Sequence, residues 1–469
     1  MSGFWYSAAI ATTTAALFSL TADIATERTH ILSPAPAASS PAQKSHHSDP
    51  EAATNPENAT PLTGQRRYQQ AMTLANQAVV AYQSARQAET LAKQVALTRQ
   101  ERDLWQQTLE LLTSIPTDAV EHAQAARKAV QYRQLLATAE GKLTTADRTF
   151  LTQIIQSARV NPQRVHVTLC QLGGPVTQSH RQSKRGHSHS QKGRLNRDRC
   201  RDHQGDMPMA SPASLIKLPI AIALLDKVAT ENVDLSSRIY IDPGNFTENA
   251  AGANIEVGQE YPLSQVMTRM INESNNIATN QLIDYVGHAD IAETLLNRGY
   301  TSTLVGHKLA GDRILPKNPG TQTNRATTND ITVMMAHTYS LENPGDEELL
   351  KALVSQNDQE FGYQALQDLD PAIKWLGEKT GQNNRVIGST LAMEVGADRY
   401  ALTVAIDHSA DPHAMRAIIR QVAEYLLAAG SLTETSERSP ALPSAALNSE
   451  GPEHKDSEEK VQAPAETTS

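Results

Sequence analysis

Hydrophobic residues between Gly64 and about Leu143 recur at spacings of three and four in an Ala- and Gln-rich sequence. This spacing places them on one face of an α-helix. The positions that follow it are Met72, Ala75, Val79, Tyr82 and Ala85, and later Trp105, Leu109 and Leu112. Residues 64–143 are therefore predicted to form a helical hairpin or small bundle. Its simplest role is that of a spacer or interaction segment ahead of a second domain.

The pattern changes after Thr144. One more helix is predicted over Ala146–Ala158, and hydrophobic and polar residues then alternate from Arg164 to Leu172, as in a half-buried strand. Helices and strands are mixed in the rest of this region, which predicts an α+β domain over residues 144–430. The further strands are predicted over Trp375–Gly381, Val386–Val395 and Tyr400–Asp407, and the helices over Ser214–Ala229, Leu263–Val286 and Pro412–Ala429.

Both ends of the chain differ in composition from these two regions. Residues 1–22 are apolar and small, which indicates an export signal or an uncleaved membrane anchor, although no Lys or Arg precedes the apolar run. The alternative is an apolar N-terminus with no role in export. Residues 23–63, rich in Pro, Ser and Ala, and the acidic residues 431–469 are predicted to be disordered. The chain is thus expected to be exported, to the periplasm or the cell envelope.

The 469 residues carry a formal charge of -9, which argues against a dedicated nucleic-acid-binding protein. A basic insertion over residues 179–203 contains eight Lys or Arg against two Asp. It is interpreted as a solvated insertion at the tip of a hairpin, and attraction to an anionic cell-wall polymer is the weaker alternative. His187 and His189 within it have no carboxylate or Cys nearby, so a metal site is not favoured there.

The two cysteines, Cys170 and Cys200, flank this insertion. Outside the cytoplasm they can form a disulfide across its base, and a pair of free thiols is the alternative. Two cysteines are too few for a disulfide scaffold or a Cys-rich metal site.

Three short motifs supply the parts of a serine acyl-transfer site. They are Ser214-Leu215-Ile216-Lys217, then Ser274-Asn275-Asn276 sixty residues on, then Lys379-Thr380-Gly381 after another 105. Each motif alone is compatible with a helix cap, a polar turn or the end of a strand. The ordered set is far less easily produced by chance.

Each motif has a chemical role in such a site. A spacing of three on a helix puts Lys217 on the same face as Ser214, where it can act as the base that activates the serine hydroxyl. Ser274 can relay a proton to the leaving amine, and Asn276 can bind a substrate amide. Lys379 and Thr380 suit a substrate carboxylate, while Gly381 leaves room for a peptide along the strand. Activation by a lysine implies no metal or other cofactor.

These residues resemble the class A β-lactamase family and its penicillin-binding relatives over about residues 144–430. Pro212–Pro219 is similar to the family's nucleophile segment, Met270–Asn280 to its second element, and Arg325–Thr328 to the end of its omega loop. The resemblance implies an antiparallel five-stranded sheet packed with helices and joined to an all-helical subdomain. It also implies an oxyanion hole formed by the backbone N–H groups of Ser214 and Gln382.

Two departures from the family pattern concern the omega loop. The glutamate that activates the deacylating water in these lactamases has no counterpart here, because Leu315 stands at its place in the stretch Asp312–Pro316 and no Glu lies between Glu293 and Glu342. The family's Arg–Asp clasp has its Arg in Arg313, but Ala326 stands where the Asp is expected. A smaller departure is Asn275, where Asp is usual.

A site that acylates without this glutamate resembles a penicillin-binding D-alanyl-D-alanine peptidase, and most closely the class A-like penicillin-binding proteins of cyanobacteria. The expected function is that of a DD-peptidase acting on peptidoglycan stem peptides, with β-lactams as further ligands. One alternative is a β-lactamase whose water is activated by Asp312 or Lys217. Another is a non-catalytic envelope protein that keeps the fold.

Overall fold

The computed structural model describes residues 63–172, 199–248, 254–430 and 432. The predicted signal, all of the linker but Thr63, all of the acidic tail but Leu432 and most of the basic insertion lie outside them. The helices are α2 (Gly64–Arg86), α3 (Leu91–Thr113), α4 (His122–Ser157), α5 (Lys217–Glu231), α6 (Leu263–Asn272), α7 (Asn276–Val286), α8 (His288–Asn297), α9 (Thr328–Tyr339), α10 (Asp346–Val354), α11 (Gly362–Leu366) and α12 (Pro412–Ala429), with 3-10 turns η1 (Pro162–Arg164), η3 (Ala213–Ile216) and η4 (Pro243–Asn245). The strands are β1 (Val165–Gln171), β2 (Cys200–His203), β3 (Arg238–Tyr240), β4 (Glu260–Pro262), β5 (Ile373–Asn383), β6 (Val386–Val395) and β7 (Asp398–Asp407).

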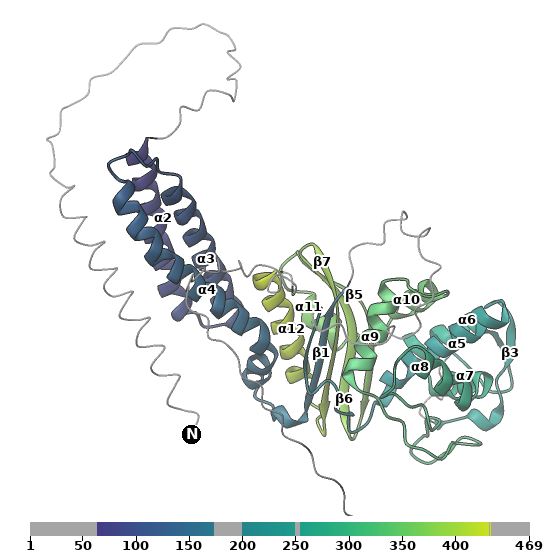
Figure 1. The fold of residues 1–469 in the computed structure, drawn as a ribbon. Helices are drawn as coiled ribbons and strands as arrows, with labels where there is room; N and C mark the ends of the chain where they lie inside the picture. Colours follow the sequence, from purple (N-terminus) through teal and green to yellow (C-terminus); the bar gives the residue numbers. More distant parts are fainter. Residues whose placement is uncertain (1–62, 173–198, 249–253, 431, 433–469) are drawn as a thin grey trace, which may run out of the picture. The chain divides into compact units, whose positions relative to one another are not determined.

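The central element is a five-stranded sheet in the order β2-β1-β7-β6-β5 (Figure 1). All neighbours pair antiparallel, which confirms the predicted sheet. Strand β2 was not predicted, and its four residues were assigned to the end of the basic insertion. That assignment was wrong because Cys200–His203 has no alternation of its own and becomes a strand only by pairing with β1.

The two faces of the sheet are covered by different helices. Leu402, Val404 and Ile406 of β7 join a core with α12 and the second half of α4, whereas Ala401 and Ala405 contact the core on the side of α9. Figure 1 shows α12 on one face and α9 on the other. The alternation along β7 that predicted a strand thus sorts side chains between two cores.

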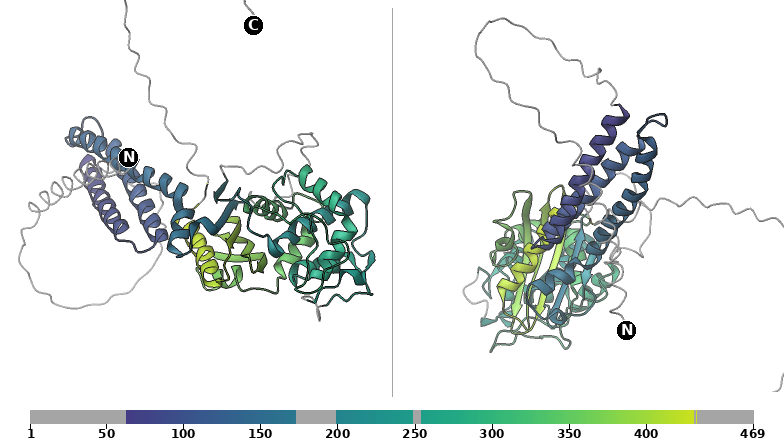
Figure 2. Two further views of the ribbon diagram at one scale, coloured as in Figure 1. Left: turned by 90° about the horizontal axis from the view of Figure 1, so that it is seen from below. Right: turned by 90° about the vertical axis from the view of Figure 1, so that its left-hand side faces the viewer.

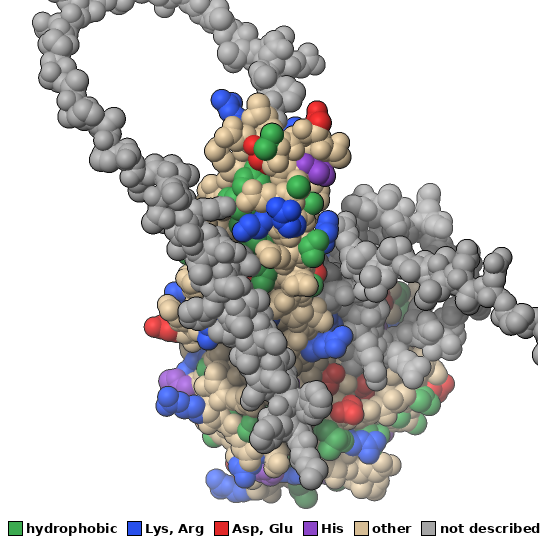
Figure 3. All heavy atoms as spheres, turned by 60° about the vertical axis from the view of Figure 1, so that its left-hand side comes forward, with side chains coloured by type: hydrophobic (Ala, Val, Ile, Leu, Met, Phe, Trp, Pro, Cys, Tyr) green, Lys and Arg blue, Asp and Glu red, His purple; other side chains and the backbone are tan. Residues whose placement is uncertain are grey.

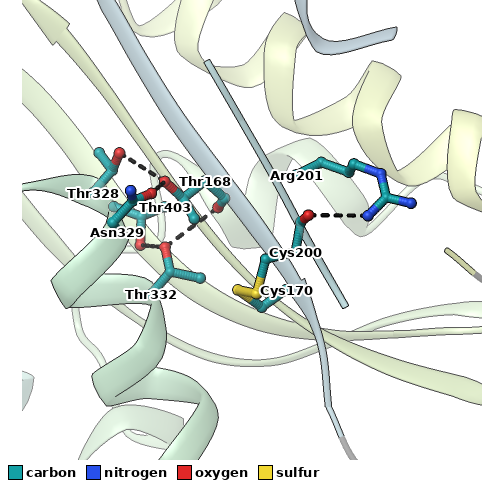
Figure 4. The surroundings of a disulfide bond; sticks show 8 residues. All are labelled: Thr168, Cys170, Cys200, Arg201, Thr328, Asn329, Thr332 and Thr403. Carbon is teal, nitrogen blue, oxygen red and sulfur yellow. Dashed lines mark hydrogen bonds between the residues drawn. A yellow bond between two sulfur atoms is a disulfide. The ribbon is translucent and has the colours of Figure 1, made fainter. Parts of the chain in front are cut away.

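Threonine hydroxyls join α9 to the sheet (Figure 4). Thr332 donates to Thr403 of β7 at 2.6 Å, and Thr168 of β1 lies 2.9 Å from the hydroxyl of Thr328. Thr403 is also 2.8 Å from Thr390 of β6. All of these side chains are buried, so their mutual hydrogen bonds offset the cost of removing them from water.

The helical segment is formed by α2, α3 and the first half of α4, which lie side by side (Figure 2). Its core holds Trp105 and Tyr132, with ring centroids 4.9 Å apart. On the face that Figure 3 shows, basic, acidic and hydrophobic side chains are interspersed over this segment.

Helix α4 differs from the sequence prediction, which began a separate helix at Ala146. It runs unbroken over 36 residues, and Phe150 and Ile154 at its end pack in the core of the sheet. The intervening Gly141 lowers helix propensity without ending a helix that tertiary packing supports. The domain boundary expected near residue 143 therefore falls inside a helix and stays a prediction.

Helices α5 to α8 form a second, helical body at the other side of α9 (Figure 1). Helix α5 is apolar around most of its circumference and is buried over Lys217–Leu225. Helices α6 and α7 confirm the two helical stretches predicted over Leu263–Val286. Among the helices described, none is long and apolar enough to cross a membrane.

Cys170 and Cys200 face each other in the pairing of β1 with β2 and are joined by a disulfide (Figure 4). Of the two alternatives left open by the sequence, the structure contains the bonded one. The bridge closes a loop with a sequence separation of 30.

We expect no free thiol when the oxidised protein is denatured without reductant and titrated. Reduction, or Cys200→Ser, is expected to lower the free energy of unfolding by about 3–4 kcal/mol, because a loop of this length gains that much conformational entropy when it opens. Denaturant unfolding with and without reductant measures the difference. The double variant Cys170→Ser with Cys200→Ser is the control, and reductant should leave it unchanged.

Candidate active site

Ser214 lies in the 3-10 turn η3 immediately before α5. The preceding Ala213 has a φ of 44°, a left-handed conformation that is uncommon for a residue with a side chain. Such strain is often found where a turn must present a functional group. Here the turn brings Ser214 to a cavity wall while Lys217, three residues on, begins the buried face of α5.

Lys217 is fully buried and makes four close contacts with oxygen atoms. Its Nζ lies 3.0 Å from Ser214 Oγ, 2.5 Å from the carbonyl oxygen of Ser274, 3.0 Å from Ser274 Oγ and 2.8 Å from Asn276 Oδ1. Burial, and then the nearby charge of Lys379, lower the pKa of Lys217 well below its ordinary value. The neutral amine is therefore accessible, as a general base requires.

Ser274 occupies the turn between α6 and α7, with a φ of 55°. The turn is fixed by Asn275, whose side chain accepts the backbone N–H of Ala278 at 2.9 Å and so caps α7. Asn is as good a cap as the Asp usual at this place, which explains how the middle residue of the motif can change.

Lys379 reaches Ser274 from the edge strand β5. Its Nζ lies 3.1 Å from Ser274 Oγ and 2.8 Å from the carbonyl oxygen of Thr380. Burial lowers the pKa of Lys379 to about 7, against the opposing effect of Asp358 and Glu378. Two ammonium groups around one hydroxyl would repel each other, and the carboxylates favour the charge on Lys379. We therefore assign the neutral amine to Lys217 and the positive charge to Lys379.

Gly381 lets β5 lie directly against the nucleophile turn. A Cβ atom there would be 2.9 Å from the backbone nitrogen of Leu215 and 3.0 Å from that of Ser214. Strand β5 therefore packs directly against the backbone N–H of Ser214, a group that can stabilise an oxyanion. That the backbone N–H groups of Ser214 and Gln382 together form one oxyanion hole stays a prediction.

A cavity of about 540 Å³ opens beside Ser214. It is lined by the predicted residues Ser214, Asn276 and Gln382, and by residues 307–310 and 321–324. Lys217, Ser274 and Lys379 lie behind this wall in the hydrogen-bonded group described above. The structure thus brings these six predicted residues together at the cavity, three on its wall and three in the hydrogen-bonded group, and their roles stay predictions.

The loop opposite Ser214 differs from the sequence prediction. Leu315, expected at the place of the missing glutamate, has 69% of its surface exposed and does not line the cavity. Leu309 lines it instead, and its backbone is held by Asn280, which donates to the carbonyl at 2.9 Å and accepts the N–H at 2.8 Å. Asn280 is four residues after Asn276 on the same face of α7. Its contact with Leu309 joins residues 29 apart in sequence, so no local pattern reveals it.

The clasp of the loop also differs from the expected Arg–Asp pair. Ala326 is buried, and Arg313 is exposed, with its backbone N–H bound to the Glu248 carboxylate. The loop is held instead by Lys308, only 2% exposed, whose Nζ contacts Asn245 Oδ1 at 2.8 Å and Asp284 Oδ1 at 2.7 Å. It also donates to the backbone carbonyl of residue 317 at 2.7 Å. These partners are too far apart in sequence for a local pattern to reveal them.

The sequence of the chain also matches a family model, the beta-lactamase enzyme family, over residues 195–429. That span contains all three motifs and half of the chain. The chain belongs to this family. The five-stranded sheet with its flanking helices is accordingly the fold of a β-lactamase family protein.

Individual relatives are more distant. The chain is 25% identical to beta-lactamase VEB-1 of Pseudomonas aeruginosa over 134 residues, which cover 28% of this chain and 44% of that protein. Beta-lactamase of Sphaerobacter thermophilus matches at 21% identity with a TM-score of 0.46, over 60% of this chain and 97% of that one. A structure of PBP-A matches at 21% identity and a TM-score of 0.46, over 58% and 94%.

A leucine-to-glutamate variant of PBP-A, solved as its acyl-enzyme with penicillin G, matches at the same identity and TM-score, over 59% and 94%. At these scores the individual structures add nothing to the assignment, which rests on the family match and on the sheet topology.

Replacement of Gly381 should disturb the nucleophile turn. Gly381→Ala places a Cβ against two backbone nitrogens that cannot move aside, so we expect acylation by benzylpenicillin to slow by about 10²-fold, comparable to the loss of an oxyanion donor. Stopped-flow or quenched mass spectrometry measures the rate. Gly388→Ala on the facing strand is the control, because its Cβ meets the flexible end of the Leu215 side chain at 3.0 Å. Equal slowing of both variants would contradict the role given to Gly381.

Replacement of Leu309 should supply the missing carboxylate. In Leu309→Glu the new side chain starts from a fixed backbone on the cavity wall, so we expect the penicilloyl-enzyme to be released at least about 10²-fold faster through general-base activation of water. The lifetime of the adduct is followed by intact mass. The matched variant Leu315→Glu, on the exposed side of the same loop, should leave the lifetime unchanged. Faster release in Leu315→Glu alone would instead support Leu315 as the counterpart of the family's glutamate.

Proposed function

We propose that this chain is a penicillin-binding serine DD-peptidase that acts on the D-Ala-D-Ala ends of peptidoglycan stem peptides through an acyl-enzyme on Ser214. The proposal rests on one contrast within the site. Lys217 and Ser274 are hydrogen-bonded around Ser214, whereas the loop contributes the apolar Leu309 to the cavity wall, and the carboxylate that it contributes, Asp312, is exposed. Such a site forms an ester with a β-lactam and lacks the means to release it quickly.

Acylation follows from the hydrogen bonds. Ser214 Oγ gives its proton to the neutral Lys217 amine as it attacks the carbonyl carbon of the penultimate D-Ala. Ser274 Oγ, within 3.0 Å of Lys217 and 3.1 Å of Lys379, passes a proton on to the leaving amine. Lys379 and Thr380 bind the carboxylate of the departing residue, and Asn276 binds a backbone amide of the donor peptide.

The Asn276 side chain is oriented for this task. Its Oδ1 accepts from Lys217, so its amide N–H₂ is left to donate into the cavity that the residue lines. The same contact makes substrate binding and the position of the base depend on each other.

Hydrolysis of β-lactams is the second candidate, because Asp312 also lines the cavity and is a carboxylate that can activate water. It is exposed, however, and lies in a part of the loop whose backbone is held from outside by Glu248. We therefore rank it below peptidase action.

The substrate also implies a location. A peptidase of peptidoglycan works outside the cytoplasm, so we propose that residues 1–22 direct export or anchor the chain in a membrane. The disulfide between Cys170 and Cys200 is consistent with an oxidising compartment. The helical segment then serves as a spacer ahead of the catalytic domain.

The first experiment is incubation of the full chain with benzylpenicillin, followed by intact mass over time. We expect a long-lived adduct of one penicilloyl group that is absent in Ser214→Ala, together with release of D-Ala from an acylated D-Ala-D-Ala peptide. An adduct that disappears within seconds as penicillin is consumed would support the β-lactamase. Absence of both the adduct and peptide cleavage would leave a non-catalytic protein of this fold.

A further inference from the structure

His307 lines the cavity beside Ser214 and has no part in acylation. It immediately precedes the clasp residue Lys308 in the loop, and none of the three motifs includes it. A titratable side chain on the wall of a catalytic cavity is a candidate for proton transfer, provided that its backbone and its ring are both fixed.

The backbone of His307 is fixed from two sides. The side chain of Asn324 accepts the N–H groups of Gly306 and His307, each at 2.9 Å, and donates to the carbonyl of His307 at 2.8 Å. His307 also forms a β-bridge with Gly320, whose φ is 99° and whose missing Cβ would lie 2.2 Å from the carbonyl oxygen of Gly306. The close approach requires glycine at that position.

The ring of His307 is fixed by its Nδ1, which is hydrogen-bonded to the carbonyl oxygen of Lys308. A carbonyl only accepts, so Nδ1 carries the proton and Nε2 of the neutral ring keeps its lone pair. In the described part of the chain Nε2 has no hydrogen-bond partner. This is the arrangement of a general base that is held in one tautomer.

The other charged residues that line the same cavity are Lys308, Asp312 and Arg385. Lys308 directs its ammonium away from the cavity to Asp284 and Asn245. Asp312 and Arg385 carry opposite charges and are both exposed, so solvent screens their effect on the ring.

We propose that His307 is the general base that releases the peptidyl group from Ser214. A water molecule, or the amine of a second stem peptide, adds to the ester carbonyl carbon while its proton passes to His307 Nε2. The tetrahedral intermediate then expels Ser214 Oγ, which takes up the proton held by the His307 imidazolium, so that Ser214, Lys217 and His307 all return to their starting protonation states. The step rests on the proposed peptidase function, since it requires a peptidyl ester.

The same base need not release a β-lactam. In a peptide the leaving D-Ala departs and frees space beside the ester, whereas the amine expelled from a β-lactam stays attached to the acyl group through its ring. It therefore remains in the cavity and hinders the approach of water from the side of His307. A peptidase with His307 as its base thus turns over peptides and is still trapped by penicillin.

The test uses the full chain and a D-Ala-D-lactate depsipeptide, whose good leaving group makes deacylation rate-limiting. We expect His307→Ala to acylate at the wild-type rate and to release the peptidyl group at least about 10²-fold more slowly. The fall of the wild-type deacylation rate toward acid, which an imidazole base produces, should vanish in the variant, and added imidazole should restore part of the rate. His413→Ala, at an exposed histidine on α12, is the matched control.

A deacylation rate within about twofold of wild type in His307→Ala would overturn the assignment, and so would equal losses in acylation and deacylation, which indicate a merely structural role. A wild-type chain that forms no acyl-enzyme with either the depsipeptide or benzylpenicillin would instead overturn the proposed function, and this step with it.

Discussion

The site depends on the buried amine of Lys217, which is surrounded by more oxygen acceptors than an ammonium group has protons. The Ser274 carbonyl and Asn276 Oδ1 only accept, so they take the two protons of a neutral Lys217 amine. The lone pair is then left for the hydroxyl protons of Ser214 and Ser274, whose Oγ atoms both lie 3.0 Å from Nζ. Burial alone would lower the pKa of Lys217, but this distribution of acceptors also turns the lone pair toward the nucleophile and the second serine.

This arrangement joins three parts of the fold that are far apart in sequence. Lys217 comes from α5, its acceptors come from the turn between α6 and α7, and Lys379 comes from the sheet. The geometry of the base therefore exists only when the helical body and the sheet are both folded. A substitution that alters the packing of either body therefore displaces Ser274 and disturbs the geometry at Ser214, even when no site residue is replaced.

Sequence reasoning was strongest where function is carried by local patterns. The alternation in β7 and the helix Pro412–Ala429 are each readable from neighbouring residues, and the structure contains both elements. The three motifs are equally local, and the structure brings their residues together. It was weakest in the loop. Leu315 follows the Asp312-Arg313 pair that resembles the family's loop. The residue that lines the cavity is Leu309, and it is held there by the side chain of Asn280, which is distant in sequence. Strand β2 and the Lys308 clasp were missed for the same reason, since long-range pairing defines both.

The disulfide has a topological consequence. Because Cys170 and Cys200 are covalently joined, a cut in the chain anywhere between them opens a ring and does not separate the molecule into two pieces. Strand β2 would stay attached to β1, and Arg201 would keep its ion pair with Asp147 of α4 at 2.5 Å. A cut in this part of the chain, or its exchange for another sequence in evolution, would thus leave the five-stranded sheet as one body.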